Sequence, residues 1–284
     1  MAGVLYAGLP HPIHHWPVVM GEATIAARSV TEHAALRLFS SWFCPYAQRS
    51  WAQLEELVDL GLTTYKWVDI DPYAAPDTKQ PLSLDAKRQK YPDFVAASPR
   101  GLVPAIEHEG IFVNDSQVVC EYLSDAFPQT LLPADAKDRA RIRVFWEHVS
   151  SQILPFFYRL LMGKDAEARQ DAHDKLLSGL RSANSLMLLS SASGYFLGDD
   201  RYSLADLALA PWWYRFPIVL GTYRGFTIPE TTEYARLNNW WTHMSQRESF
   251  RRTWVSADRL VHNYREYAAG TATSEVARTL ASTK

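Results

Sequence analysis

The sequence predicts an α+β protein of two domains, in which a mixed four-stranded sheet with helices is followed by an all-helical domain. Short apolar runs alternate with helical patterns up to about residue 128, and beyond that point only helical spacing recurs. The length supports two domains, because 284 residues exceed the roughly 100 to 150 residues of a typical domain.

The expected first domain, residues 34–128, opens with the apolar run LRLFSSW at 36–42, which predicts a strand. Pro45 suits the first position of a helix, because its missing N–H would be unpaired there anyway. TYKWVDID at 64–71 predicts a second strand. The proline-rich segment 72–83 then excludes regular structure, and we expect an inserted loop there.

A helical stretch at 84–97 precedes two short apolar runs that flank a glycine-containing turn within 98–115. This pattern predicts a β-hairpin, so the four expected strands form a mixed sheet. Ser116 is in position to cap the next helix, in which apolar residues recur at helical spacing as far as Phe127.

The expected second domain, residues 135–267, has no convincing strand-like alternation. Helices are expected over four ranges: 135–163, 165–192, 203–220 and 233–267. Ser203 and Asp206 have the spacing of a capping box at the start of the third of these. Residues 1–33 are expected to form an extension, and residues 268–284 a polar tail whose last ~15 residues lack regular structure.

The composition excludes several classes of protein. With 29 basic and 31 acidic residues the net charge is −2, which offers no electrostatic attraction for nucleic acid. The longest apolar stretch, 207–221, is interrupted by two prolines and an arginine and is too short to span a membrane. Two cysteines and no secretory pattern at the start indicate a cytoplasmic protein. The histidine-rich segment 11–17 lacks cysteine or carboxylate partners, so no metal is expected.

Cys44 stands directly before Pro45, where the first strand gives way to a helix. A sulfur there lies near unpaired backbone N–H groups and the positive end of the helix dipole, which favour the thiolate. Lowering a thiol pKa from ~8.5 to ~5 requires about 5 kcal/mol, and the dipole supplies at most ~2 kcal/mol, so hydrogen bonds to the sulfur must supply the rest. Ala47 occupies the place of a second cysteine, so the partner thiol must come from elsewhere. The alternative, a buried structural cysteine, is what we expect of Cys120 inside a helix.

Four motifs occur in one order: Cys-Pro-Tyr at 44–46, GLVPAI at 101–106, Asp115-Ser116 opening a helix, and Ser-x-x-Asp at 203–206. Together they resemble a cytosolic glutathione transferase, and the cysteine points to the omega class in the form seen in fungi. The resemblance covers about residues 36–265. It implies the glutathione transferase fold with a thioredoxin-like first domain, glutathione as cosubstrate, and a homodimer.

The resemblance also implies roles for individual residues. Cys44 would face the sulfur of glutathione, with Tyr46 packed beside it. The backbone of Val103, held by a cis Pro104, would pair with the cysteinyl part of glutathione. Asp115 and Ser116 would hold the γ-glutamyl end at a helix N-terminus, although the family usually has the longer Glu before this serine. Without the resemblance, these positions are interpreted as a strand residue, a turn proline and a helix cap.

One basic residue of the family pattern is missing. The lysine of a Lys-Pro pair that normally follows the second strand is replaced by Ala75-Pro76. Lys79, Lys87 or Lys90 could supply the charge, and spacing does not choose among them. We take Lys90 as the candidate for binding glutathione.

Aromatic residues concentrate in the helical domain, within 154–161 and 207–217. Most large aromatics on helices belong to the core. Their number exceeds what one face needs, so we expect some to line a hydrophobic acceptor-substrate pocket. The candidates are Tyr158, Trp212, Arg215 and Phe216.

The predicted function is that of an omega-like glutathione transferase acting as a thiol transferase in detoxification. The Cys44 thiolate would attack the glutathione sulfur of a small hydrophobic or glutathionylated substrate, leaving a mixed disulfide that a second glutathione resolves.

Two alternatives use the same fold. A protein resembling the intracellular chloride channels would need a first helix able to enter a membrane, but Gln48, Arg49 and Glu55 make this helix too polar. A non-catalytic carrier of polyphenols or other hydrophobic compounds would use only the aromatic pocket.

Overall fold

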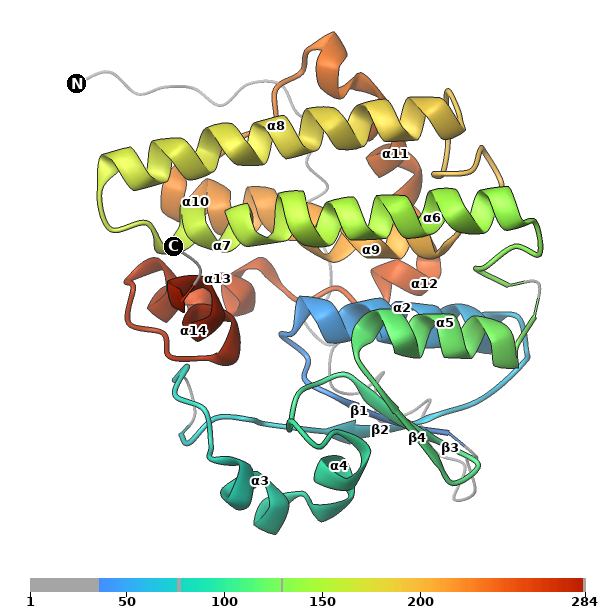
Figure 1. The fold of residues 1–284 in the computed structure, drawn as a ribbon, viewed down its shortest axis with the longest axis vertical. Coiled ribbons are helices and arrows are strands. Elements are labelled where there is room, and N and C mark those ends of the chain that lie inside the picture. The colour runs from blue at the N-terminus through green and yellow to red at the C-terminus, as the bar shows by residue number, and fades with distance from the viewer. Residues whose placement is uncertain (1–35, 76–77, 129, 283–284) are drawn as a thin grey trace.

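The computed structural model describes residues 36–75, 78–128 and 130–282, and has a sheet layer packed beneath a larger bundle of helices (Figure 1). This confirms the expected α+β class, with the mixed sheet first in the chain and the helical part second. The expected extension 1–33 and its histidines lie outside the described residues.

The sheet has the strand order β2-β1-β3-β4. Its strands are β1 (Leu36–Ser40), β2 (Lys66–Asp69), β3 (Ala105–His108) and β4 (Ile111–Asn114). β1 pairs in parallel with β2 and antiparallel with β3, which places Leu38 between Trp67 and Ile106. β3 and β4 form the predicted hairpin. β1 ends at Ser40, two residues earlier than expected, because a turn at 41–43 leads the chain into the next helix.

Helices cover both faces of the sheet. One face carries α2 (Pro45–Asp59) and α5 (Ser116–Ala126), and the other carries α3 (Leu84–Lys90) and α4 (Pro92–Ala97), as Figure 1 shows. On the first face, leucines of β1 pack against Leu54 and Leu57 of α2 and Leu123 of α5. On the second, Phe94 and Val95 of α4 pack against Phe39. Burial of these apolar side chains supplies most of the stability of this part.

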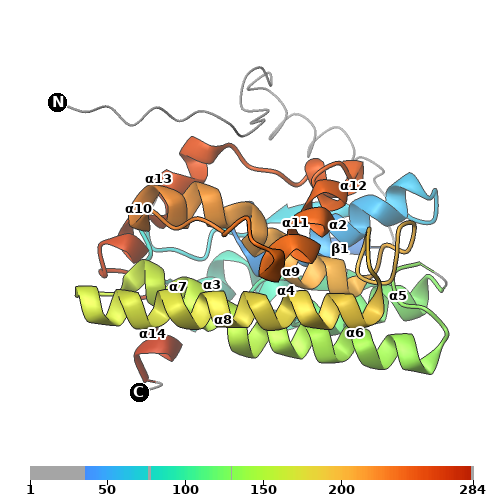
Figure 2. The same cartoon turned by 90° about the horizontal axis from the view of Figure 1, so that it is seen from above.

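The helical part is a bundle of helices (Figures 1 and 2). Its buried side chains form a large apolar core. Its helices are α6 (Ala136–His148), α7 (Leu154–Met162), α8 (Ala166–Ser190), α9 (Leu204–Arg215), α10 (Gly221–Arg224), α11 (Ala235–Met244), α12 (Glu248–Arg251), α13 (Ala257–Ala268) and α14 (Glu275–Ser282). Two π-helical segments, Val149–Ile153 and Phe216–Leu220, join α6 to α7 and α9 to α10, and a 3₁₀ turn, Thr232–Tyr234, precedes α11. α8 is the longest helix and lies alongside α6 and α7.

Two expectations for the C-terminal third are wrong. The range 233–267 is three helices, α11, α12 and α13, although it contains neither proline nor glycine. The helices are interrupted where side chains within 247–253 contact α2. The tail is not without regular structure either, since α14 packs on α7, with Ala277 buried and Glu275 paired with Arg100 at 3.0 Å.

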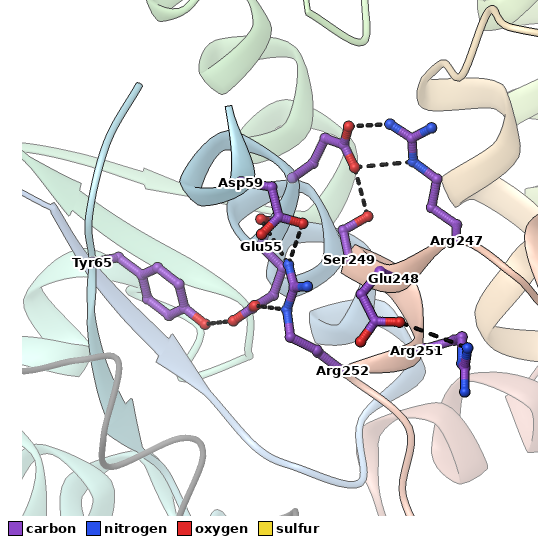
Figure 3. Close-up of polar contacts among 9 residues, drawn as sticks. Glu55, Asp59, Tyr65, Arg247, Glu248, Ser249, Arg251 and Arg252 are labelled. Carbon is purple, nitrogen blue, oxygen red and sulfur yellow. Dashed lines mark hydrogen bonds and ion pairs between the residues drawn. The ribbon is translucent and has the colours of Figure 1, made fainter. Parts of the chain in front are cut away.

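Buried ion pairs join α2 to the segment around α12, as Figure 3 shows. Glu55 accepts hydrogen bonds from Arg252 Nε and from the Tyr65 hydroxyl, both at 2.6 Å. Glu56 accepts from Ser249 Oγ at 2.6 Å and is paired with Arg247. These contacts fix α2, and with it the start of the helix at Cys44, against the helical part.

Candidate active site

Cys44 is the N-cap of α2, immediately after the turn that follows β1. Its N–H donates to the Ser41 carbonyl at 3.0 Å and its carbonyl accepts from the Gln48 N–H at 3.0 Å, so its backbone is fixed on both sides. The N–H groups of Tyr46 and Ala47 lower the pKa of its thiol, but the sulfur makes no side-chain capping hydrogen bond. Pro45 has no N–H to offer, so these are the first two available helical N–H groups. The structure gives the position at the helix start that the sequence predicted, but not the hydrogen bonds to the sulfur.

The direction of the pKa shift is not the one predicted. Burial raises the pKa of the Cys44 thiol, and this outweighs the lowering by the two N–H donors and by the charges of Arg215 and Lys79. The sequence predicts the effect of the helix end on this pKa, but not the effect of the side chains that cover the sulfur. Cys120 matches its expectation as a core residue, because it is fully buried and burial raises its pKa to about 12.

Five tyrosines interact electrostatically with Cys44. Burial raises the pKa of each, and the charge of Cys44 adds to that rise. They come from α2, the loop after β2, α7 and α13: Tyr46, Tyr73, Tyr158, Tyr264 and Tyr267. Their hydroxyls stay neutral at physiological pH and can donate hydrogen bonds to an anion. The sequence analysis missed Tyr73, Tyr264 and Tyr267; the last two stand three apart on one helix, a spacing that places them on one face.

The proline-rich segment 72–83 folds back on itself next to the site. Tyr73 and Pro81 form an isolated antiparallel bridge, and the Leu82 N–H donates to the Pro72 carbonyl at 2.9 Å. The segment is tied to the C-terminal helices, because the Lys79 N–H donates to Glu266 Oε2 at 2.7 Å.

Lys79 is the lysine that this segment brings to Cys44. Its side chain is buried, with Nζ 4.3 Å from the ring centre of Phe43 and 4.2 Å from that of Tyr73. Burial lowers its pKa to about 8, while the charges of Glu266, Asp71 and Cys44 oppose that change.

The other two lysines lie elsewhere. Lys87 donates to the Gly101 carbonyl at 2.8 Å. Lys90, the candidate carried from the sequence, is exposed at the end of α3, where its Nζ is 5.0 Å from the ring centre of Tyr91. The structure therefore brings Lys79, rather than Lys90, to the cysteine.

The Val103–Pro104 peptide bond is cis, as the resemblance implied. Asp115 has a left-handed φ of 75°, rare for a residue with a side chain, and is itself the N-cap of α5. Its Oδ1 accepts from the N–H of Gln117 at 2.9 Å, whereas Ser116, the expected cap, is the first helical residue. The sequence placed the cap one residue too late.

Arg49 lies beneath Ser116 and was not recognised from the sequence as part of the site. Its Nη1 donates to Ser116 Oγ at 3.2 Å and its Nη2 to the Ala208 carbonyl of α9 at 2.7 Å. The guanidinium is 4.4 Å from the ring centre of Trp146 and 4.6 Å from that of Trp212. Burial lowers its pKa to about 10. It puts positive charge behind the expected γ-glutamyl position.

The four residues predicted for the hydrophobic substrate pocket are all buried: Tyr158, Trp212, Arg215 and Phe216. Trp212 and Phe216 belong to the main core, with Trp212 in edge contact with Tyr46 at 4.8 Å between ring centres. Tyr158 belongs to the same core and interacts with Cys44 only through charge. Arg215 is the one of the four whose hydrogen bonds reach the residue next to Cys44.

Within residues 36–75, 78–128 and 130–282, no cluster of three or more histidine, cysteine or acidic side chains could bind a metal ion. Over the same part of the chain, no helix combines the length and apolar character required to cross a membrane.

Comparison with known proteins gives the family. The family model for the glutathione S-transferase N-terminal domain matches residues 43–126, and that for the C-terminal domain matches residues 166–241. The crystal structure of glutathione transferase Omega 3C from Trametes versicolor has 32% identity and a TM-score of 0.69, and the match covers 90% of this chain and 98% of that one.

Curated relatives point the same way. Glutathione S-transferase DHAR2 of Arabidopsis thaliana is 30% identical over 56% of this chain and 68% of its own length. DHAR3 of the same plant is 27% identical over 62% of this chain and 63% of its own length, and omega-1 of Mus musculus is 29% identical over 63% and 66%. The chain belongs to the glutathione transferase family, which confirms the resemblance noted in the sequence.

Proposed function

We propose that the protein is a glutathione-dependent thiol transferase of the omega type, working in the cytoplasm in detoxification. The observation that carries the proposal is a single cysteine at the N-cap of α2, where the N–H groups of Tyr46 and Ala47 lower the pKa of its thiol. Because Ala47 stands where a dithiol enzyme would have its second sulfur, the resolving thiol must come from a second glutathione. The omega-class and DHAR relatives support the same chemistry.

The reaction proceeds in two exchanges. The Cys44 thiolate attacks the glutathione sulfur of a mixed disulfide; a Cys44–glutathione disulfide forms, and the substrate leaves as a thiolate that takes a proton from water. The thiolate of a second glutathione then attacks the glutathione sulfur of that adduct, releasing glutathione disulfide and regenerating the Cys44 thiolate. A glutathionyl ketone enters the same way, with the carbon leaving as an enolate that is protonated to the ketone.

Glutathione would bind along the edge of the sheet. The Val103 backbone would pair with its cysteinyl part, and Asp115 and Ser116 at the start of α5 would hold the γ-glutamyl end, with the charge of Arg49 behind them. Lys79 would attract the remaining carboxylate, because it is the lysine beside Cys44.

Lys79 makes the affinity for glutathione depend on pH. Since its pKa is lowered to about 8, the amine loses its charge as pH rises through 8, and its attraction for a carboxylate is lost with it. We expect S-methylglutathione to bind the Cys44→Ser variant at least about fivefold more weakly at pH 9.5 than at pH 7, measured by calorimetry. This ligand and background leave no thiol to titrate at the site. The α-amino group of the ligand also titrates in this range, so the effect of Lys79 is the part of the fall that is absent from Lys79→Arg. If Lys79→Met shows the same fall, the assignment to Lys79 is wrong.

The direct test of the function is to find the intermediate. The purified protein is mixed with one equivalent of a glutathionylated peptide and quenched in acid. The masses of its proteolytic peptides are then measured by mass spectrometry. Cys44 should carry glutathione, Cys120 should not, and added glutathione should remove the adduct with release of glutathione disulfide. Substrate turnover with no adduct on Cys44 at any time would contradict the mechanism.

We also propose that the protein is a homodimer. Three apolar residues are exposed on neighbouring elements, namely Ile111 of the edge strand β4, Val118 of α5 and Val144 of α6, at 57%, 53% and 55%. Arg143 and Glu121 join α6 to α5 beside them at 2.6 Å, so the three elements form one face. An exposed apolar face next to an edge strand favours association.

Sedimentation at micromolar concentration should give the mass of two chains. Ile111→Glu combined with Val144→Glu should give one, because two charges would be buried at the proposed interface. Leu189→Glu, at a 76% exposed leucine of α8 outside this face, is the matched control and should remain a dimer. A monomeric wild type would reject the proposal.

A further inference from the structure

Arg215 is a fully buried cation at the end of α9. Its Nη1 donates to Gln48 Oε1 at 2.6 Å and to the Pro211 carbonyl at 2.7 Å, and its Nη2 donates to the Phe43 carbonyl at 3.1 Å. Its Nε has no hydrogen-bond partner among the described residues. The guanidinium therefore contacts the residue immediately before Cys44 from the opposite domain.

No carboxylate is among these described partners, which distinguishes Arg215 from the arginines that join α2 to the helical part. Arg252 is paired with Glu55, and Arg247 with Glu56. Taking a charge out of water is costly unless an opposite charge compensates it. A buried guanidinium bonded only to neutral oxygens is poised to stabilise an anion that forms later.

We propose that Arg215 is the counter-charge of the Cys44 thiolate, supplied by the helical domain to a cysteine of the sheet domain. The inference rests on the proposed function, in which Cys44 must ionise before it attacks. On ionisation the thiol proton passes to solvent, and the negative sulfur gains the attraction of the guanidinium. The N–H groups of α2 contribute only partial charges, and Arg215 contributes a full charge.

Gln48 and Thr253 hold the guanidinium in place, and both are buried. Gln48 Nε2 donates to the Thr253 carbonyl at 3.1 Å and to its Oγ1 at 3.0 Å, which turns the amide oxygen of Gln48 toward Arg215. Gln48 lies one turn after Cys44 on the same helix, so it fixes the cation relative to the sulfur. It is a positioning residue.

The other groups that act on Cys44 do not replace this charge. Lys79 attracts the thiolate, but its pKa of about 8 means that it becomes neutral in the alkaline range, whereas a guanidinium stays charged. Arg49 is held by Ser116 and Ala208. The tyrosines, at positions 46, 73, 158, 264 and 267, are neutral because burial raises the pKa of each.

The experiment measures how the alkylation rate of Cys44 depends on pH, in a Cys120→Ala background so that one thiol is present. Iodoacetamide is the probe, because it requires neither glutathione nor an acceptor. Arg215→Met should move the midpoint of the profile up by at least about one unit. The rate at pH 8 should then fall about threefold or more, because a tenfold loss of thiolate is partly offset by its greater nucleophilicity. Arg215→Lys should return the midpoint most of the way to its wild-type value.

Two further variants distinguish the effect of the Arg215 charge on the midpoint from a general effect on folding. Gln48→Glu keeps Arg215 but gives it a carboxylate partner, and it should raise the midpoint as Arg215→Met does. Arg236→Met removes a buried arginine of α11 that donates to the carbonyls of Ser191 and Gly194, and it should leave the midpoint unchanged.

An unchanged midpoint in folded Arg215→Met or Gln48→Glu protein would overturn the proposal, as would an equal shift in Arg236→Met. The outcome is independent of catalysis. If thiol transfer survived without Cys44, the proposed function would fail while the shifted alkylation profile still assigned the counter-charge.

Discussion

The Cys44→Ser variant is expected to lose thiol transfer by at least a thousandfold, a barrier increase of about 4 kcal/mol. Catalysis requires a sulfur that can form a mixed disulfide, and a hydroxyl cannot form one. Glutathione binding should change less than about threefold, because it would rest on Val103, Asp115, Ser116 and the start of α5, which the substitution leaves in place. The serine hydroxyl at this N-cap can donate a hydrogen bond to the thiolate of bound glutathione, so weak conjugation of glutathione to an electrophile should appear.

Wild type and variant are compared by calorimetric titration with glutathione and by turnover of a glutathionylated peptide. Cys120→Ser is the control; its thiol is buried in the core, and it should retain the wild-type rate. If Cys44→Ser kept its thiol-transfer rate within about threefold, less than 1 kcal/mol of barrier, Cys44 would not be the nucleophile.

The Asp206→Ala variant is expected to destabilise the fold by about 4 kcal/mol or more. The carboxylate is fully buried at the start of α9 and accepts four hydrogen bonds: from the N–H of Phe196 at 2.8 Å, Trp240 Nε1 at 2.9 Å, the Ser203 N–H at 2.8 Å and Ser203 Oγ at 2.9 Å. Alanine leaves these donors buried without an acceptor, at about 1 to 3 kcal/mol each. Such a loss removes much of the ~5 to 15 kcal/mol that stabilises a folded domain.

Urea unfolding of the two proteins, followed by tryptophan fluorescence, measures the loss. Ser203→Ala removes only one of the four donors and keeps the other contacts of Asp206, so it should cost about 1 kcal/mol. A loss below about 2 kcal/mol for Asp206→Ala would show that water or a rearranged α11 replaces the carboxylate.

The parts of the fold that the sequence predicted are those set by local signals. Pro45 marks the start of α2, the apolar runs around Gly110 mark the hairpin, and Ser203 with Asp206 marks the start of α9. The division of 233–267 into three helices was not predictable in this way. Its breaks depend on Arg247 and Arg252 reaching Glu56 and Glu55, which lie almost two hundred residues earlier.

The same distinction between local signals and distant contacts applies to the residues of the site. Cys44, the cis Pro104 and the Asp115-Ser116 pair follow from short motifs, and the structure places them as expected apart from the position of the cap. Lys79 could not be chosen from spacing, because a folded-back loop brings it to the cysteine. The upward pKa shift of Cys44 is caused by burial, which depends on the tertiary structure, so no local pattern contains it.

The seam between the two parts of the molecule has a consequence for its evolution. Arg49 reaches the Ala208 carbonyl, Gln48 reaches Thr253, and Arg215 reaches the Phe43 carbonyl, so each side completes the polar groups of the other. A recombination event that exchanged the helical half for that of a distant relative would keep the backbone carbonyls, but it would leave Gln48 without its partners wherever the relative lacks Arg215 and Thr253. Gln48 on one side and Arg215 with Thr253 on the other are therefore expected to change together.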